Sequence, residues 1–580
     1  MKKIQYLIFS VGFGILLVVG SSCRKYEEQP KDWFTKDMAF DQLDQNGIIT
    51  GYVLNNIYTY IPDGFGRING DFLDAATDDA VPSTLNKPIE YFTRGTVTSS
   101  NNPEESPATG YGLTFWGNCY YGIRRANLFL ANINQTPVAA QTKQYWISEA
   151  RFLRAYFYWE LLKRYGGVPL LGDKVYALEE NIQLPRNTFA ETVNYIVSEC
   201  DAIKASMRPD PIGGSDLGRA SKGAGAALKC RVLLYAASPL YNGGGFESDP
   251  IKKALTGYPT DDPSRWQAVI NAYTEFKALG YYNFVTTGTP TAFVSIFINR
   301  TVNTEIIFAK QNSNNINLEN NQSPVGFIAS NVKSQGLTSP TQNLVDAFPM
   351  ANGLSINDPA SGYSAASPYT GRDPRLAATV FFNGAAWLNR TVQTYEGGLD
   401  KPNNTGISQV QTRTGYYLRK FLGNFVTGNT YSNTSHNFPI FRYAEIVLNY
   451  AEALNELGQT EAAVQQVILV RQRAGINAGT NSRYGIAAGI SQDNLRTLIM
   501  GERRIEFAFE EQRFWDIRRW KTAPQVMTQA LVGVTITNPT APLFQLNPVS
   551  TPVWNNRLYH MPIPYDETLK NPKLIQNEGW

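Results

Sequence analysis

The residues best suited to chemistry in this chain are glutamates that recur every four positions. Glu502, Glu506 and Glu510 lie in GERRIEFAFEEQRFWDIRRW, residues 501–520. On a helix they would line one face, and paired carboxylates can hydrolyse glycosidic bonds. The carboxylates of a glycosidase, however, normally come from different elements, about 5 to 10 Å apart. Five arginines surround these glutamates in the sequence, so we expect an ion-paired network that holds helices together. The arginines are Arg503, Arg504, Arg513, Arg518 and Arg519.

Histidines, cysteines and a glycine-rich loop give little support for catalysis. The chain has 2 histidines, His436 and His560, and both are isolated in the sequence, so we expect structural or surface roles. Residues 213–220, GGSDLGRA, have the glycine spacing of a phosphate-binding loop but lack the Lys and Ser or Thr that must follow. We therefore expect no enzyme activity and no cofactor or metal. Three cysteines without a C-x-x-C pair are expected to be buried in helices: Cys119, Cys200 and Cys230.

The N-terminus has the pattern of an export signal. A pair of lysines precedes an apolar run from residue 4 to 20, and small residues lead to Cys23. This ending resembles a bacterial lipoprotein box, so we expect a signal peptide over 1–22 and lipidation, by palmitate or a similar acyl chain, at Cys23. Residues 23–36 are polar and predict a tether. An ordinary secreted protein is the alternative.

The charge balance argues against a nucleic-acid partner. The chain carries 52 basic and 49 acidic residues, a formal net charge of +3. Such a small excess creates no large field to attract a phosphate backbone. We therefore expect a ligand that is uncharged or recognised locally.

Hydrophobic periodicity predicts the elements that must position these side chains. Residues 150–171, ARFLRAYFYWELLKRYGGVPLL, place apolar side chains on two helical faces and end in a Gly-Gly-Val-Pro stop. We expect a helix packed between neighbours, with Tyr158 at its edge. Repeated helix pairs of about 35 to 45 residues predict a mainly α fold with a tetratricopeptide-like scaffold. The expected pairs are 142–165 with 188–207, 219–237 with 263–279, and 441–458 with 459–476.

Two regions interrupt the helical pattern. Residues 61–112 and 281–435 are rich in Gly, Asn, Thr, Pro and Tyr and contain only short apolar runs. Long irregular insertions on a rigid scaffold are where binding commonly resides. We therefore expect the ligand to bind at these insertions.

Several stretches together resemble the signatures of the SusD/RagB family of outer-membrane nutrient-binding lipoproteins. They follow the order of that family across nearly the whole mature chain. The stretches are FWGNCYYGIRRANLFLANI (115–133), EARFLRAYFYWELLKRYGGVPLL (149–171), GRASKGAGAALKCRVLLYAASPLYN (218–242), RDPRL (372–376), FPIFRYAEIVLNYAEALNELG (438–458), ERRIEFAFEEQRFWDIRRW (502–520) and MPIPYDETLKNPKLIQNEGW (561–580).

The resemblance implies both a location and a partner. It implies a lipid-anchored protein on the outer face of the outer membrane, for which Glu27 and Glu28 resemble the surface-export signal. It also implies capture of an oligo- or polysaccharide and delivery to a SusC-like TonB-dependent transporter, without catalysis. The expected parts are an N-terminal SusD-like helical part (37–280), a loop-rich insertion (281–435) and a C-terminal SusD/RagB helical part (436–580).

In such a protein we expect aromatic side chains in the insertions to bind the sugar. The apolar face of a pyranose packs on an aromatic ring, while Asp, Asn and Arg bond its hydroxyl groups. Trp116 lies at a helix start and is expected in the core. The candidates are Asp74, Asp78, Tyr91, Phe92, Arg94 and Tyr111 in the first insertion, and Tyr363, Tyr369, Trp387 and Tyr395 in the second.

Three other functions remain open at this point. The RagB branch of the family implies peptide capture. A surface glycoside hydrolase would use carboxylates such as Glu506 or Asp516. A structural interaction protein would bind no small ligand and would expose a large apolar surface.

Overall fold

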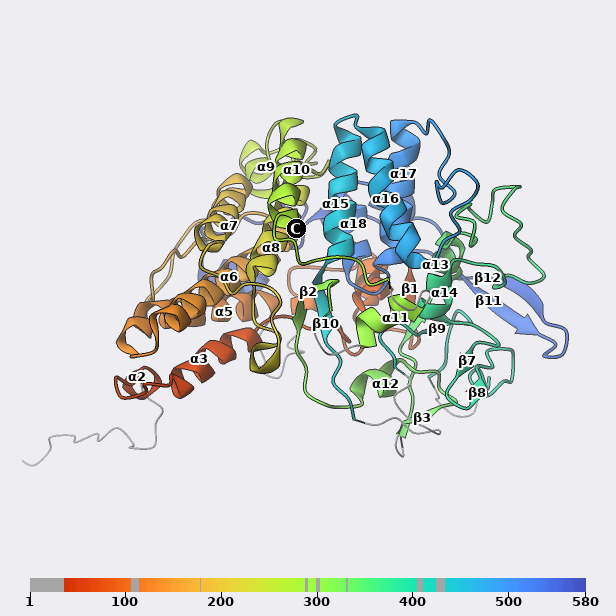
Figure 1. Cartoon of the computed structure of the whole chain (residues 1–580), viewed down its shortest axis with the longest axis horizontal. Helices are drawn as coiled ribbons and strands as arrows, with labels where there is room; N and C mark the ends of the chain where they lie inside the picture. Colours follow the sequence, from red (N-terminus) through yellow and green to blue (C-terminus); the bar gives the residue numbers. More distant parts are fainter. Residues whose placement is uncertain are drawn as a thin grey trace, which may run out of the picture.

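The computed structural model describes residues 36–105, 114–177, 179–286, 291–298, 303–329, 332–403, 410–423 and 433–580. Helices dominate these residues and the strands are short, so the predicted mainly α fold class is confirmed. Figure 1 shows the helices gathered on one side and at the top, with the loop-rich part at the lower right. The predicted signal peptide, Cys23, the tether up to residue 35 and Tyr111 lie outside the described residues.

The N-terminal half is built from helices that pack on their neighbours in the sequence. α5 packs on α6, α6 on α7, α7 on α8, and α8 on α10, which is the expected hairpin stack. None of the helices in the described ranges is long and apolar enough to span a membrane. The helices are α2 (Lys36–Ala39), α3 (Ile48–Thr59), α5 (Phe115–Asn132), α6 (Ala140–Tyr165), α7 (Phe189–Ile203), α8 (Lys222–Ala237), α9 (Pro250–Thr256) and α10 (Ser264–Lys277).

The C-terminal half continues the stack. α15 packs on α8 and α10, and so joins the two halves, while α16 and α17 pack on its other side. Gly458, with φ 74°, forms the tight turn between α15 and α16. The helices are α15 (Tyr443–Glu456), α16 (Thr460–Ala474), α17 (Gln492–Glu506), α18 (Gln512–Arg519), α19 (Ala523–Val526) and α20 (Tyr565–Lys570).

The end of α6 shows why its stop signal consists of glycines. Gly166 has φ 79° and ψ −151°, a backbone region that only glycine adopts readily. A Cβ atom there would lie 2.3 Å from the carbonyl oxygen of Leu255. α7 then begins with a capping box, in which the Thr188 side chain and the Glu191 side chain bond each other's backbone NH.

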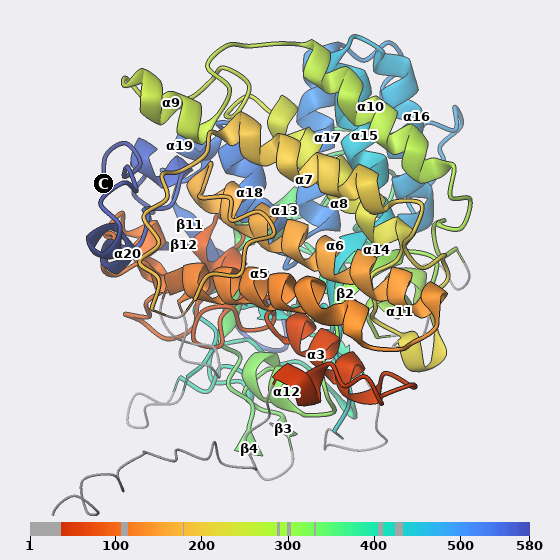
Figure 2. The ribbon, with the colours of Figure 1, turned by 90° about the vertical axis from the view of Figure 1, so that its left-hand side faces the viewer.

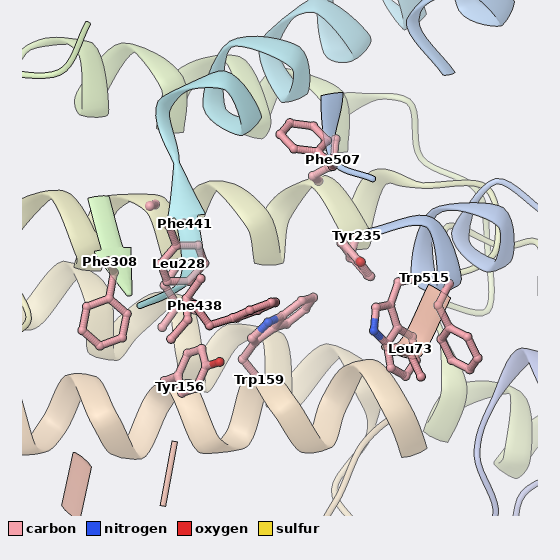
Figure 3. Close-up of a cluster of buried hydrophobic side chains, with 14 of the residues drawn as sticks. Leu73, Tyr156, Trp159, Leu228, Tyr235, Phe308, Phe438, Phe441, Phe507 and Trp515 are labelled. Atoms are coloured by element: carbon pink, nitrogen blue, oxygen red, sulfur yellow. The ribbon is translucent and has the colours of Figure 1, made fainter. Parts of the chain in front are cut away.

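The aromatic run of α6 lies in the core. Tyr156, Phe157, Tyr158 and Trp159 are all buried, and Figure 3 shows two of them among rings from several other elements. The expectation that Tyr158 lies at the helix edge is wrong. Its hydroxyl oxygen accepts a hydrogen bond from the backbone NH of Leu171 (2.9 Å), which fixes the chain after the helix.

The insertions fold into short elements that pair in two-stranded sheets. The helical segments are η1 (Leu73–Ala76), α4 (Glu90–Thr93), η2 (Pro103–Glu105), α11 (Thr291–Ile298), α12 (Asn317–Gln322), α13 (Gln342–Ala347) and α14 (Pro374–Thr379). The antiparallel pairs are β1 (Ala80–Pro82) with β5 (Thr338–Pro340), β2 (Ile306–Lys310) with β10 (Phe438–Arg442), β3 (Ile328–Ala329) with β4 (Val332–Lys333), β6 (Val380–Phe381) with β9 (Tyr417–Leu418), and β7 (Ala386–Trp387) with β8 (Arg390–Thr391). A separate hairpin, β11 (Leu531–Thr537) with β12 (Leu543–Ser550), extends from the body at the right of Figure 1.

Candidate functional site

The recurring glutamates form a buried ion-pair network. Glu506 is fully buried and accepts hydrogen bonds from Arg375 (3.0 Å), Arg442 (3.1 Å) and Arg473. Burial alone would raise the pKa of its carboxyl, but the attraction of Arg473, Arg442 and Arg375 holds it below the usual range. A carboxylate surrounded in this way has no free face for a sugar or a water molecule.

The neighbouring carboxylates are paired in the same way. Glu502 lies 2.7 Å from Arg375 and 2.8 Å from Arg471. Glu510 lies 2.6 Å from both Arg442 and Lys420. An ion-paired network is therefore present, as predicted, but its cations are not the expected ones. The three glutamates pair with cations from other elements, whereas the arginines beside them in the sequence pair with other carboxylates, Arg503 with Asp516 and Arg513 with Asp78.

Asp516, the other carboxylate of the hydrolase alternative, is also held in the core. It lies 3.0 Å from Arg503 and 2.7 Å from Arg519. The geometry thus gives the hydrolase alternative no support from Glu506 or Asp516.

The histidines and cysteines are core residues. His436 Nε2 lies 2.7 Å from Glu319 Oε1, and burial lowers the pKa of His560 to about 4. Cys119, Cys200 and Cys230 are buried free thiols, as predicted. Across the described ranges, no group of three or more His, Cys, Asp or Glu side chains is arranged to hold a metal ion.

The predicted aspartates of the first insertion serve as internal links. Asp74 Oδ1 accepts a hydrogen bond from the backbone NH of Phe509 (2.8 Å). Asp78 pairs with Arg513 (2.9 Å) and Arg504 (2.8 Å), and these cations lower its pKa to about 2 although burial acts in the opposite direction. Both side chains are buried and fasten the insertion to the C-terminal half.

The other predicted residues of the first insertion lie on or just after α4. Phe92 is buried against Phe514, with ring centroids 5.3 Å apart, and Tyr91 is half-buried. Arg94 is exposed and pairs with Glu90 (2.8 Å).

The aromatics of the second insertion mostly pack within it. Trp387 is buried against Phe381, and Tyr369 stacks on Phe382 with ring centroids 4.2 Å apart. Tyr395 is half-buried and donates to Gln393 Oε1 (3.2 Å), and Tyr363 lies 5.6 Å from the guanidinium of Arg372. Those of the predicted residues that the structure describes are therefore not brought together into one site.

A groove of about 490 Å³ opens instead beside the first half of α5, and we refer to it as the first groove. Trp116 lines it from the core side, as a buried residue, as expected. Figure 2 shows α20 beside the start of α5. The lining residues are Trp116, Gly117, Tyr120, Tyr121, Arg124, Pro169, Leu171, Lys174, Tyr176, Glu180, Asn181, Ile182, Leu184, Glu567, Lys570, Asn571 and Leu574.

Hydrogen bonds fix the walls of the first groove. Gln183 Nε2 donates to the carbonyl oxygen of Lys570 (2.7 Å), and Asn571 Nδ2 donates to that of Leu184 (2.8 Å). The hydroxyl of Tyr120 donates to the carbonyl oxygen of Pro169 (3.0 Å). The groove is thus preformed, as ligand sites usually are.

Rings and ion pairs define the chemistry of the first groove. Tyr121 is 47% exposed, so its ring is available to a ligand. The Tyr176 ring lies 4.0 Å from Lys174 Nζ, which also pairs with Glu180 (2.6 Å). Lys570 on the opposite wall pairs with a glutamate of α20. An apolar, aromatic groove with a polar rim can bind a sugar through its ring faces and its hydroxyl groups.

Sequence reasoning missed Tyr121 and Tyr176. One signal for Tyr121 was present, because Trp116, Cys119 and Ile123 follow helical spacing on the buried side of α5, which places Tyr121 outside that stripe. The groove itself could not be inferred, because its second wall comes from α20.

Comparisons with known proteins identify the family. The solved structure of a SusD-like protein from Bacteroides fragilis matches with a TM-score of 0.76 and 31% identity, covering 94% of this chain and 99% of that one. The chain belongs to the SusD family. The SusD family model matches residues 304–580 of this SusD-like chain. A second model, described as starch-binding associating with outer membrane, matches residues 49–234.

More distant relatives share the length of this SusD-like chain. A SusD-like protein of Formosa agariphila is 25% identical over 484 residues, covering 80% of this chain and 78% of the relative. The solved structure named surface glycan-binding protein A from Bacteroides fluxus has a TM-score of 0.59 at 20% identity, covering 91% of this chain and 98% of that chain. This second likeness concerns the fold alone.

Proposed function

We propose that this SusD-like protein is a surface lipoprotein that binds an oligo- or polysaccharide and delivers it to a SusC-like TonB-dependent transporter. Membership of a glycan-binding family associated with the outer membrane supports a carbohydrate ligand and this location. The observation that carries the proposal is the first groove, with its aromatic lining and polar rim. Lipidation at Cys23 would hold the protein at the membrane through the polar residues that follow.

Binding in the first groove requires no covalent step. A pyranose face would pack on the exposed ring of Tyr121, and its hydroxyl groups would bond the exposed side chain of Asn181. The charged pairs on both walls offer further donors and acceptors, so the hydroxyl groups can exchange water for protein partners. A binding protein that releases its ligand unchanged suits delivery to a transporter.

A binding screen with residues 26–580 tests this function. The chain is applied to a glycan array and to a peptide library, and each hit is measured by calorimetry and by product analysis. Saturable binding of one polysaccharide class without turnover is the expected result. Binding of peptides alone would support the peptide-capture alternative, and release of sugar products would support the hydrolase alternative.

A further inference from the structure

A second groove of equal volume, about 490 Å³, lies farther along α5, against α2 and α3. Its most exposed ring is that of Tyr52, at 66%. We refer to it as the second groove. It is lined by Lys36, Ala39, Phe40, Tyr52, Val53, Asn56, Arg125, Leu128 and Asn132.

Tyr121 links the first groove to the α3 side of the molecule. This residue lines the first groove, and its ring lies nearly parallel to that of Tyr60, with centroids 6.4 Å apart and 23° between the planes. Tyr60 follows α3, whose residues Tyr52 and Asn56 line the second groove. Tyr52, Asn56 and Tyr60 are spaced by four and form one stripe about 12 Å long, which begins at the exposed Tyr52 and ends at Tyr60, a buried residue.

α5 supplies the facing stripe. Tyr121, Arg125 and Leu128 follow one another at helical spacing, over about 10 Å of helix. Tyr121 and Arg125 are exposed, and Arg125 and Leu128 line the second groove. Figure 2 shows α3 lying along the later part of α5, whereas α20 lies beside its start. Tyr121 in the first groove and Arg125 in the second are one helical turn apart on α5, so their exposed side chains connect the two grooves.

We propose that the two grooves form one track for an extended polysaccharide chain, with Tyr121 at the junction. This inference rests on the proposed function and specifies its ligand as a polymer long enough to occupy both grooves. One part of the chain lies in the first groove against the rings there. The next part passes Tyr121 and lies on Tyr52, where Asn56 and Arg125 meet the hydroxyl groups.

The track makes affinity depend on chain length. A short oligosaccharide fills one groove, whereas a long one gains the second contact without a second association event. Linked contacts of this kind raise affinity by up to about 10² to 10⁴ over a single contact. Both grooves lie on the same helix, so the distance between them is fixed and one polysaccharide chain can occupy both.

Calorimetry with oligosaccharides of one glycan class tests the track. A disaccharide, a tetrasaccharide and an octasaccharide of the class that the array identifies are titrated into wild type, Tyr52→Ala, Tyr121→Ala and Tyr565→Ala. Tyr565→Ala is the matched control, since Tyr565 is 48% exposed, close to the 47% of Tyr121, and lines neither groove. Thermal melts of each variant establish that it folds.

The expected pattern separates the two grooves. Tyr52→Ala should weaken the octasaccharide by about tenfold and leave the disaccharide unchanged, whereas Tyr121→Ala should weaken both and Tyr565→Ala neither. If Tyr52→Ala binds the octasaccharide as wild type does, or if affinity does not rise with length, the track is refuted while glycan capture stands. If wild type binds no glycan at all, the proposed function fails as well.

Discussion

Replacing Glu506 by Gln tests the assignment of the glutamates to a structural network. The substitution keeps the shape of the side chain but removes its negative charge, and it turns an NH₂ group toward a guanidinium. Arg375, Arg442 and Arg473 then lie in the core with less countercharge. Breaking a buried pair by removing one partner destabilises proteins by about 3 to 5 kcal/mol, because a buried charge is left uncompensated.

The expected shift in melting temperature follows from the size of the chain. Unfolding entropy of about 2.1 cal/mol/K per residue over 580 residues amounts to about 1.2 kcal/mol/K for cooperative unfolding. A loss of 3 to 5 kcal/mol therefore lowers Tm by about 2.5 to 4 °C. Differential scanning calorimetry at neutral pH measures this shift directly.

Glu461→Gln provides the control for that experiment. Glu461 pairs with Arg483 (2.9 Å), but its side chain is 62% exposed, so the pair is screened by water. Its loss should change stability by at most about 1 kcal/mol, less than about 1 °C in Tm. If both variants melt within half a degree of each other, Glu506 is not the centre of a stabilising network and our reasoning is wrong.

Three further predictions concern pH, backbone geometry and anchoring. Burial raises the pKa of the Asp71 carboxyl to about 7, above the unfolded value of about 4, so the stability that protonated Asp71 contributes is lost as pH rises from 4 to 7. The Tm of Asp71→Asn minus that of wild type should therefore increase over this pH range, and a difference that is equal at all pH values would contradict the prediction. Gly166→Ala should destabilise by at least about 2 kcal/mol, whereas Gly501→Ala, in a helix with open space around it, should leave stability unchanged or raise it by up to about 1 kcal/mol, as urea melts would show. Cys23→Ala should abolish membrane retention on cell fractionation, and the released protein should bind glycan as the chain of residues 26–580 does. A variant that stays in the membrane fraction would refute lipidation at this residue.

The helical scaffold could be predicted because its signals are local. The spacing of apolar residues in 150–171 and the Gly-Gly stop depend only on neighbours in the sequence. The helix pairs followed for the same reason. The depth of burial was harder to predict, and Tyr158 was misplaced because the backbone NH that meets its hydroxyl lies in the next segment.

The ligand-binding residues could not be predicted in the same way. Asp74 and Asp78 look like loop residues in the sequence, but they meet partners about 435 positions away. The walls of the first groove are joined by hydrogen bonds between residues 387 positions apart. Aromatic content therefore pointed to the insertions, while the exposed rings of Tyr52 and Tyr121 lie on scaffold helices.

The buried thiols make this chain convenient for attaching reporter dyes. In a chain that begins at residue 26, the sulfur atoms of Cys119, Cys200 and Cys230 are shielded from reagents, and burial raises the pKa of Cys200 to about 12. Maleimide reagents will therefore leave the native thiols unmodified in the folded protein. One thiol introduced on each flank of α5 would carry a fluorophore pair at a known spacing, without any native residue having to be removed first.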